Sequence, residues 1–205
     1  MTYSEEIITK LEKLKNKVSD KELIELYEDK IISLNSASLS YWFAKNVKGA
    51  KIKVHESIVF SSNDPGLCYL FALDVKGADT YKLGEVVLNS KILEYNLRYA
   101  RDIKKCDKEA HAKIILDSKD LVYNYHFAKD VKGANVDAHA QIILDSKDLI
   151  YNYLFVTEVK GAKKEAHKKI LDEIVAKSVD DQIEDTKKEL NELLNLKLKQ
   201  NKNID

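Results

Sequence analysis

One segment recurs along this chain at a fixed period, and such a repeat limits the fold more strongly than any local motif. The string VKGA occurs four times, with its lysines at Lys48, Lys76, Lys132 and Lys160, which sets a 28-residue period with one double step. The double step predicts a degenerate copy, which Ile103-Lys104-Lys105-Cys106 supplies. Residues 110–134 and 138–162 are identical at 19 of 25 positions. The sequence therefore contains five copies of one unit.

Each copy is expected to form two short helices joined by a tight turn. In the copy SKDLVYNYHFAKDVKGANVDAHAQIILD, Ser118 is the expected N-cap of a helix over about 119–131. The Lys-Gly that follows predicts the end of this helix, because glycine adopts the left-handed conformation at little cost. The second helix is expected to begin near Asn135, or near Asp107 in the preceding copy, and to end at the next serine.

A hairpin of this size cannot bury its apolar face alone, so stability must come from stacking on the next copy. We therefore predict an all-α fold, a right-handed α-solenoid of five 28-residue hairpins over residues 36–176. Residues 1–35 are expected to form N-terminal capping helices. Residues 177–205 are expected to form a C-terminal capping helix, begun by Ser178, and a tail. A dimerising coiled coil is the alternative for this last helix, so the chain is expected to be a monomer or a weak dimer through it.

The charge balance excludes several classes of protein. Lys and Arg number 34, as do Asp and Glu, and the net charge is zero, whereas nucleic-acid-binding proteins usually carry a basic excess. No apolar run of about 18 residues suggests a membrane span, and the first residues lack a secretory signal, so we expect a cytoplasmic protein. Cys68 and Cys106 fit no disulfide or metal spacing.

The alternation of a helix, a turn with Asp-Val-Lys and a second helix with Ile-Ile-Leu resembles a shortened form of the HEAT-type α-solenoids. It also resembles the short FAxxVKGA repeat of uncharacterised bacterial and bacteriophage proteins, over residues 36–176. This resemblance implies a binding scaffold, such as a bacterial or phage adaptor or an inhibitor of a host or defence enzyme.

Four of the five histidines occupy one repeat position, where the second copy has Leu83; they are His55, His111, His139 and His167. A metal ladder is disfavoured, because neighbouring helices lie about 8–10 Å apart whereas zinc needs ligands at about 2 Å. We expect core histidines whose ring nitrogens bond to a Tyr hydroxyl or to the column of Asn96, Asn124 and Asn152. A pH sensor stays open as the alternative.

A second column consists of the turn lysines Lys48, Lys76, Lys104, Lys132 and Lys160. They could contact a nucleic-acid backbone or another polyanion. The adjacent column of Asn46, Asp74, Asp102, Asp130 and Glu158 favours another interpretation, in which lysines and acids pair along the repeats.

Specificity in a repeat scaffold should lie where the copies differ on an exposed face. One varying row on the first helix of each copy is the predicted partner-binding surface, with Trp42, Leu70, Arg98, Arg101, His126 and Lys129. The alternative is that the N-terminal helices cover Trp42, Leu70 and Leu73.

No phosphate-binding loop, zinc-protease motif or nucleophile elbow occurs, so we expect no enzyme activity, cofactor or metal. The leading expectation is a protein-binding scaffold. A HEAT-like nucleic-acid binder, including a DNA glycosylase-like protein, is the main alternative. A structural protein that self-assembles through its C-terminal helix is the third.

Overall fold

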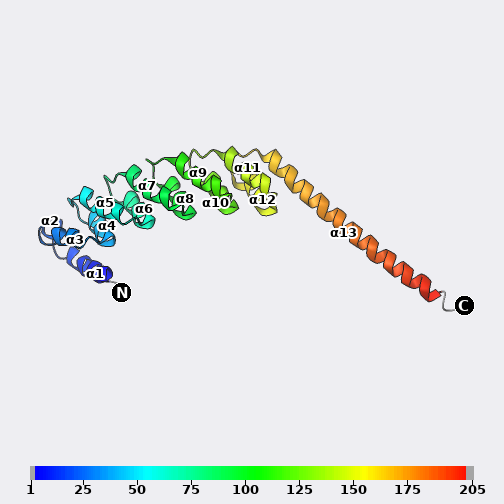
Figure 1. Cartoon of the computed structure of the whole chain (residues 1–205), viewed down its shortest axis with the longest axis horizontal. Coiled ribbons are helices and arrows are strands. Elements are labelled where there is room, and N and C mark those ends of the chain that lie inside the picture. The colour runs from blue at the N-terminus through cyan, green and yellow to red at the C-terminus, as the bar shows by residue number, and fades with distance from the viewer. Residues whose placement is uncertain (1–2, 202–205) are drawn as a thin grey trace. The chain divides into compact units, whose positions relative to one another are not determined.

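The computed structural model describes residues 3–201, with side chains for residues 3–192, and this part of the chain is helical without any strand (Figure 1). Two compact units divide the chain, residues 1–135 and 136–205. Within each unit the helices pack against their neighbours in sequence, an arrangement compatible with an α-solenoid. In the described part, no helix is long and apolar enough to cross a membrane.

The first unit opens with α1 (Tyr3–Lys15), α2 (Asp20–Leu23), a π-helix η1 (Ile24–Glu28) and α3 (Asp29–Ser33). A capping box starts α2, because the Ser19 hydroxyl accepts from the Glu22 amide and the Glu22 carboxylate accepts from the Ser19 amide. The π-helical turn lies between α2 and α3, and its last residue, Glu28, is buried.

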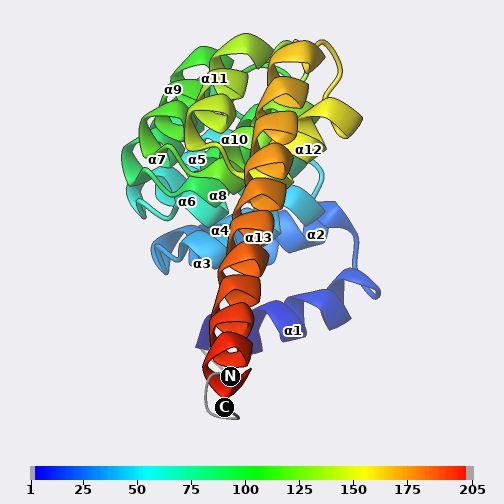
Figure 2. The same ribbon diagram turned by 90° about the vertical axis from the view of Figure 1, so that its right-hand side faces the viewer.

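Seven further helices complete the first unit: α4 (Ala37–Asn46), α5 (Ile52–Ser61), α6 (Pro65–Asp74), α7 (Thr80–Ser90), α8 (Leu93–Asp102), α9 (Lys108–Ser118) and α10 (Leu121–Asp130). Figures 1 and 2 show two layers, with α4, α6, α8 and α10 side by side in one layer. The other layer contains α3, α5, α7 and α9. We call the first of these the A layer.

The second unit contains α11 (Val136–Ser146), α12 (Leu149–Glu158) and α13 (Lys164–Asn201). The expectation that Ser178 begins a separate helix is wrong, because α13 runs through this position as one helix of 38 residues. The reason is local: no Gly or Pro occurs after Gly161, so nothing in the sequence breaks the helix. Residues 202–205 of the expected tail lie outside the described residues.

The short helices end at two kinds of left-handed residue. The turns after α4, α6, α10 and α12 use Gly49, Gly77, Gly133 and Gly161, with φ between 82° and 97°. The other turns use non-glycine residues with φ between 47° and 55°, again at one position of each repeat: Asn35, Asn63, Lys91, Lys119 and Lys147. Lys105, which replaces glycine in the degenerate copy, does not adopt a positive φ.

The expected N-cap is displaced by two positions. Ser118 is the last residue of α9, where its hydroxyl donates to the Ile115 carbonyl at 2.6 Å. Asp120 is the actual N-cap of α10, because its carboxylate accepts from the Tyr123 amide at 3.2 Å. Ser118 also accepts from the Asp120 amide at 3.1 Å, so the serine holds the turn and the aspartate caps the helix.

The centre of each copy is an aromatic residue on its first helix. Phe43, Phe71, Tyr99, Phe127 and Phe155 follow one another at the 28-residue period and are at most 1% exposed. Removing such a side chain from water stabilises the fold by at most about 3 kcal/mol. The repeat therefore supplies one large apolar anchor per hairpin, at the same place in every copy.

The left-handed turns predict opposite effects for two substitutions. Gly133→Ala should lower the free energy of unfolding by about 1 kcal/mol, because φ is +84° and no atom lies near the added Cβ except its own backbone. Lys119→Gly, at φ 55°, should raise it by a few tenths to about 1 kcal/mol, because glycine adopts this conformation without steric cost. Urea unfolding of both variants would measure the difference, and the same sign of effect at both positions would contradict this account.

Candidate functional site

The histidine column lies in the core, as the sequence predicts. His55, His111, His139 and His167 are at most 1% exposed. The Nδ1 atom of His111 lies 2.8 Å from Asn96 Oδ1, and that of His167 lies 2.7 Å from Asn152 Oδ1. The expected pairing with the asparagine column is thereby confirmed for these two histidines. Burial lowers the pKa of all four, to about 4 for His111 and His139.

Each of these asparagines joins three segments of chain. Asn96 donates to the Val87 carbonyl at the end of α7 and to the Ile92 carbonyl at the start of α8, at 3.2 and 2.9 Å. Its remaining oxygen faces His111 on α9, and this requires the Nδ1–H tautomer of that ring. The asparagines and histidines therefore form a polar network of the fold. Among the described side chains, no group of three or more His, Cys, Asp or Glu residues is placed to hold a metal ion.

Two buried carboxylates escaped the sequence analysis. Glu28 and Glu56, 1% and 3% exposed, occupy the same position of successive repeats. Each accepts a hydrogen bond at 2.6 Å from a backbone amide that precedes the second helix of the next copy, that of Lys51 or Asp79. Glu28 also lies 3.4 Å from His55 Nε2. Their spacing was the available signal, because it extends the repeat into the π-helix before α3.

Trp42, the first residue of the predicted partner-binding row, is buried and cannot contact a partner there. Trp42 is only 8% exposed and packs in a hydrophobic cluster with Leu11 of α1 and Leu23 of α2. The alternative, in which the N-terminal helices cover this tryptophan, is therefore correct. It does not extend to the neighbouring leucines, because Leu70 packs against the hydrophobic cluster of the later helices, without α1 or α2, and Leu73 is 44% exposed.

The other members of the row lie on the A layer of the first unit and reach solvent. Arg98 pairs with Glu94 on its own helix at 2.5 Å, and Arg101 pairs with Asp102 at 2.8 Å. On α10, His126 lies 3.1 Å from Asp130, and Lys129 donates to the Tyr125 hydroxyl at 2.9 Å. We call Leu70, Leu73, Arg98, Arg101, His126 and Lys129 the A-layer row. Its charges are mixed, since Arg98, Arg101 and His126 each have a carboxylate beside them.

The acidic column does pair between copies, but with different residues from those expected. Asp74 accepts from Lys45 at 2.8 Å and from the Tyr41 hydroxyl, both on the preceding helix of the A layer. Partial burial raises the Asp74 pKa, but these hydrogen bonds outweigh it and lower the pKa. Asp102 accepts from the Tyr69 hydroxyl at 2.7 Å in the equivalent place. The tyrosines and Lys45 thus take the role predicted for the turn lysines.

The turn lysines are exposed in all five copies, and the described side chains include no ion pair to any of them. In the first unit they border two small grooves at equivalent places in successive copies. One groove, of about 380 Å³, is lined by Lys45, Lys48, Asp74 and Lys76 among others. The other, of about 360 Å³, is lined by Leu73, Asp102, Lys104 and Lys105 among others. An aspartate lies in each groove, so neither is purely basic.

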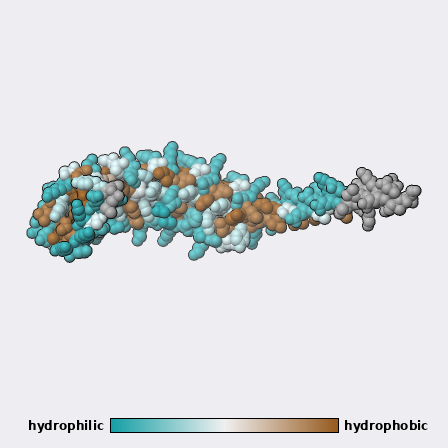
Figure 3. Space-filling model, turned by 90° about the horizontal axis from the view of Figure 1, so that it is seen from below, coloured by the Kyte–Doolittle hydropathy of each residue, from teal (hydrophilic) through white to brown (hydrophobic). Residues whose placement is uncertain are grey.

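The face of the first unit seen in Figure 3 shows hydrophobic and hydrophilic atoms intermixed, with no broad apolar area. Mixed surfaces of this kind are typical of reversible protein interfaces, which are about as polar as the rest of a surface. No protein-family model, no curated protein and no solved structure matches this chain.

The buried histidines predict a loss of stability in mild acid. The pKa of each buried histidine in the folded state lies below the unfolded value of about 6.5. Their contribution to the free energy of unfolding is therefore complete above pH 6.5 and is lost as the pH falls toward 4. For a histidine with a folded-state pKa of about 4, the free energy of unfolding should be lower by about 1 kcal/mol at pH 5.5 than at neutral pH. Urea unfolding at pH 7.5 and 5.5 would measure this loss.

A matched variant separates the histidines from the carboxylates, which also titrate in acid. The double change Asn96→Cys and His111→Leu copies the pair that the second copy already uses, Cys68 and Leu83. It should reduce the loss between pH 7.5 and 5.5 by about 1 kcal/mol. If this variant lost as much free energy of unfolding between pH 7.5 and 5.5 as the wild-type protein, His111 would not contribute to the pH dependence.

Proposed function

We propose that this protein is a non-enzymatic binding scaffold, a right-handed α-solenoid of five hairpins that holds a protein partner on its A-layer row. One observation carries the proposal. The repeat keeps its buried positions almost unchanged, yet the row reads Leu70, Arg98 and His126 on successive helices of the first unit. Stacking alone requires no such variation at half-buried and exposed positions, whereas recognition of an irregular partner does.

The chemistry of the row fits a protein better than a polyanion. Leu73 supplies exposed apolar surface, and Arg98 and Arg101 are long side chains of the kind enriched at the centres of interfaces. The carboxylates of Glu94 and Asp102 lie against these arginines and would repel a phosphate backbone. The role suggested by resemblance, a bacterial or phage adaptor or an inhibitor of a host or defence enzyme that acts in the cytoplasm, belongs to this proposal.

A second candidate rests on the turn lysines. Lys48, Lys76, Lys104 and Lys132 are exposed on the first unit, and their ammonium groups form no ion pair with its described side chains. Such lysines can follow a phosphate backbone. Against this, Asp74 and Asp102 line the same grooves, and the chain has zero net charge. We therefore rank nucleic-acid binding, including a glycosylase-like role, second.

The scaffold proposal is tested by affinity capture from nuclease-treated extract of the source organism. Wild-type protein should retain a partner in near-stoichiometric amount, and Arg98→Ala with Arg101→Ala should reduce its affinity at least tenfold. The matched control is Glu109→Ala with Lys113→Ala, exposed positions on α9 in the other layer. If both double variants retained the partner equally well, the A-layer row would not be the partner-binding surface.

The second candidate is tested with labelled single-stranded and duplex DNA by fluorescence anisotropy. If the lysines contact phosphates, affinity should fall steeply between about 50 and 200 mM salt. Lys76→Ala, Lys104→Ala and Lys132→Ala together should then reduce the salt slope by about 2–3, close to one per lysine. We expect no salt-dependent binding by the wild-type protein.

A further inference from the structure

Within α13 of the second unit, the stretch over residues 175–192 is exposed on all sides. Residues 175–192 are all exposed, although Val175, Val179, Ile183 and Leu190 are among them, at 57%, 49%, 47% and 57%. Figure 3 shows hydrophobic surface beside α12 and at places along this helix. A helix gains most of its stability in proteins by burying an apolar face, and this stretch has a face with nothing described against it.

Four apolar residues and one threonine form one straight stripe on this helix. Val175, Val179, Ile183, Thr186 and Leu190 follow one another at steps of four, four, three and four along the sequence. This is an 11-residue spacing of about 3.67 residues per turn, close to the 3.6 of a straight helix, so the stripe stays on one face. A partner helix that is itself straight could therefore follow the whole stripe.

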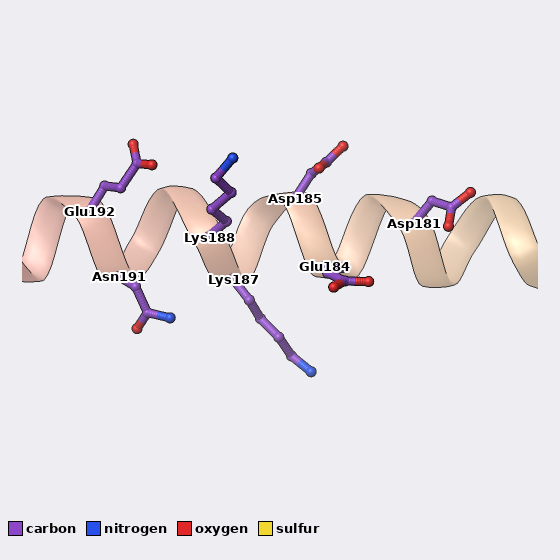
Figure 4. Close-up of a pocket in the computed structure, with 7 residues that line it drawn as sticks. All are labelled: Asp181, Glu184, Asp185, Lys187, Lys188, Asn191 and Glu192. Atoms are coloured by element: carbon purple, nitrogen blue, oxygen red, sulfur yellow. The ribbon is translucent and has the colours of Figure 1, made fainter.

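Charge is distributed unequally along the same helix. Residues 172–185 contain six acids and one lysine, whereas residues 186–192, the rest of the helix with described side chains, contain two lysines and two acids. The charged side chains diverge from α13 and enclose nothing (Figure 4). In that view Asp181, Asp185 and Lys188 project to one side, and Glu184 and Lys187 project to the other.

From the stripe and this charge pattern we infer that α13 is a dimerisation helix that packs antiparallel against α13 of a second copy, with the two-fold axis between Glu184 and Asp185. Antiparallel packing places acidic residues of each helix beside residues 186–192 of the other, which carry no net charge. Parallel packing would instead place six acids of each chain side by side at about 8–10 Å. The charges of α13 therefore favour a second copy of α13 as the partner of its exposed face, and they favour the antiparallel orientation.

This axis also matches the apolar residues in detail. It places Val179 opposite Leu190 of the second copy, and Ile183 opposite Thr186. Asp180 and Lys187 lie two turns apart on the same flank of the stripe, and equal flanks face each other in an antiparallel pair. Asp180 then lies within about two residues, or about 3 Å along the axis, of Lys187 in the second copy. Two symmetry-related ion pairs would border the apolar contact.

Sedimentation equilibrium of the full chain tests the dimer. Wild-type protein should show a concentration-dependent dimer, and Ile183→Lys should be monomeric at the same concentrations. Asp180→Lys should weaken dimerisation at least tenfold by opposing Lys187, and adding Lys187→Asp should restore it. Asp181→Lys is the matched control, because it makes the same charge change on the opposite side of the helix and should not weaken the dimer. A wild-type monomer at every concentration would overturn the inference, and so would equal effects of the Asp180 and Asp181 changes.

Cross-linking with a short bis-maleimide tests the direction. The background carries Cys68→Ser and Cys106→Ala, residues that other copies have at these positions. Thr186→Cys lies near the proposed axis and should cross-link two chains efficiently. Val175→Cys should not, because its antiparallel counterpart is about 28 Å away along the helix. Equal cross-linking at both positions would mean parallel helices and would overturn the inference. Circular dichroism of each variant would verify that α13 is retained.

Discussion

The contact between Asn96 and His111 shows what holds consecutive copies in register. The amide group of Asn96 bonds to carbonyls of α7 and α8 and faces the ring of His111 on α9, so one buried side chain fixes three helices. Removal of either partner would leave buried polar groups without hydrogen bonds, which costs about 1–3 kcal/mol each. The same arrangement at Asn152 and His167 shows that the network belongs to the repeat and not to one place in it.

This network separates two kinds of position along the chain. Buried positions such as Phe71 and Phe127 must fill the same volume in every copy, so the repeat keeps them. Half-buried and exposed positions of the A layer carry no such requirement, and there Leu70, Arg98 and His126 differ in size and charge. A solenoid can thus change its surface chemistry helix by helix while the packing between the helices stays constant.

Periodicity made much of this predictable. The helical hairpins, the glycine turns and the burial of the histidines follow from one 28-residue spacing, because stacked copies place equal residues in equal surroundings. Competition between neighbouring polar residues was not predictable in the same way. Ser118 and Asp120 are both competent N-caps, and Asp74 had several cations within reach along the chain; only the geometry shows that Asp120 and Lys45 are used. The cover over Trp42 depended on where α1 packs, which a local pattern does not specify.

One copy departs from this polar network. The second hairpin has Cys68 and Leu83 where the preceding copy has Ser40 and His55 and the following copy has Asn96 and His111, and both Cys68 and Leu83 are fully buried. The packing of α6 on α7 therefore contains no imidazole that must be charged when protons are added. In a repeat protein, where each hairpin depends chiefly on its neighbours, acid would loosen the first unit on both sides of this hairpin first. Because the hairpin of α6 and α7 cannot bury its apolar face alone, it would follow its neighbours, so acid unfolding of the first unit would begin at the copies that contain histidine and reach this hairpin last.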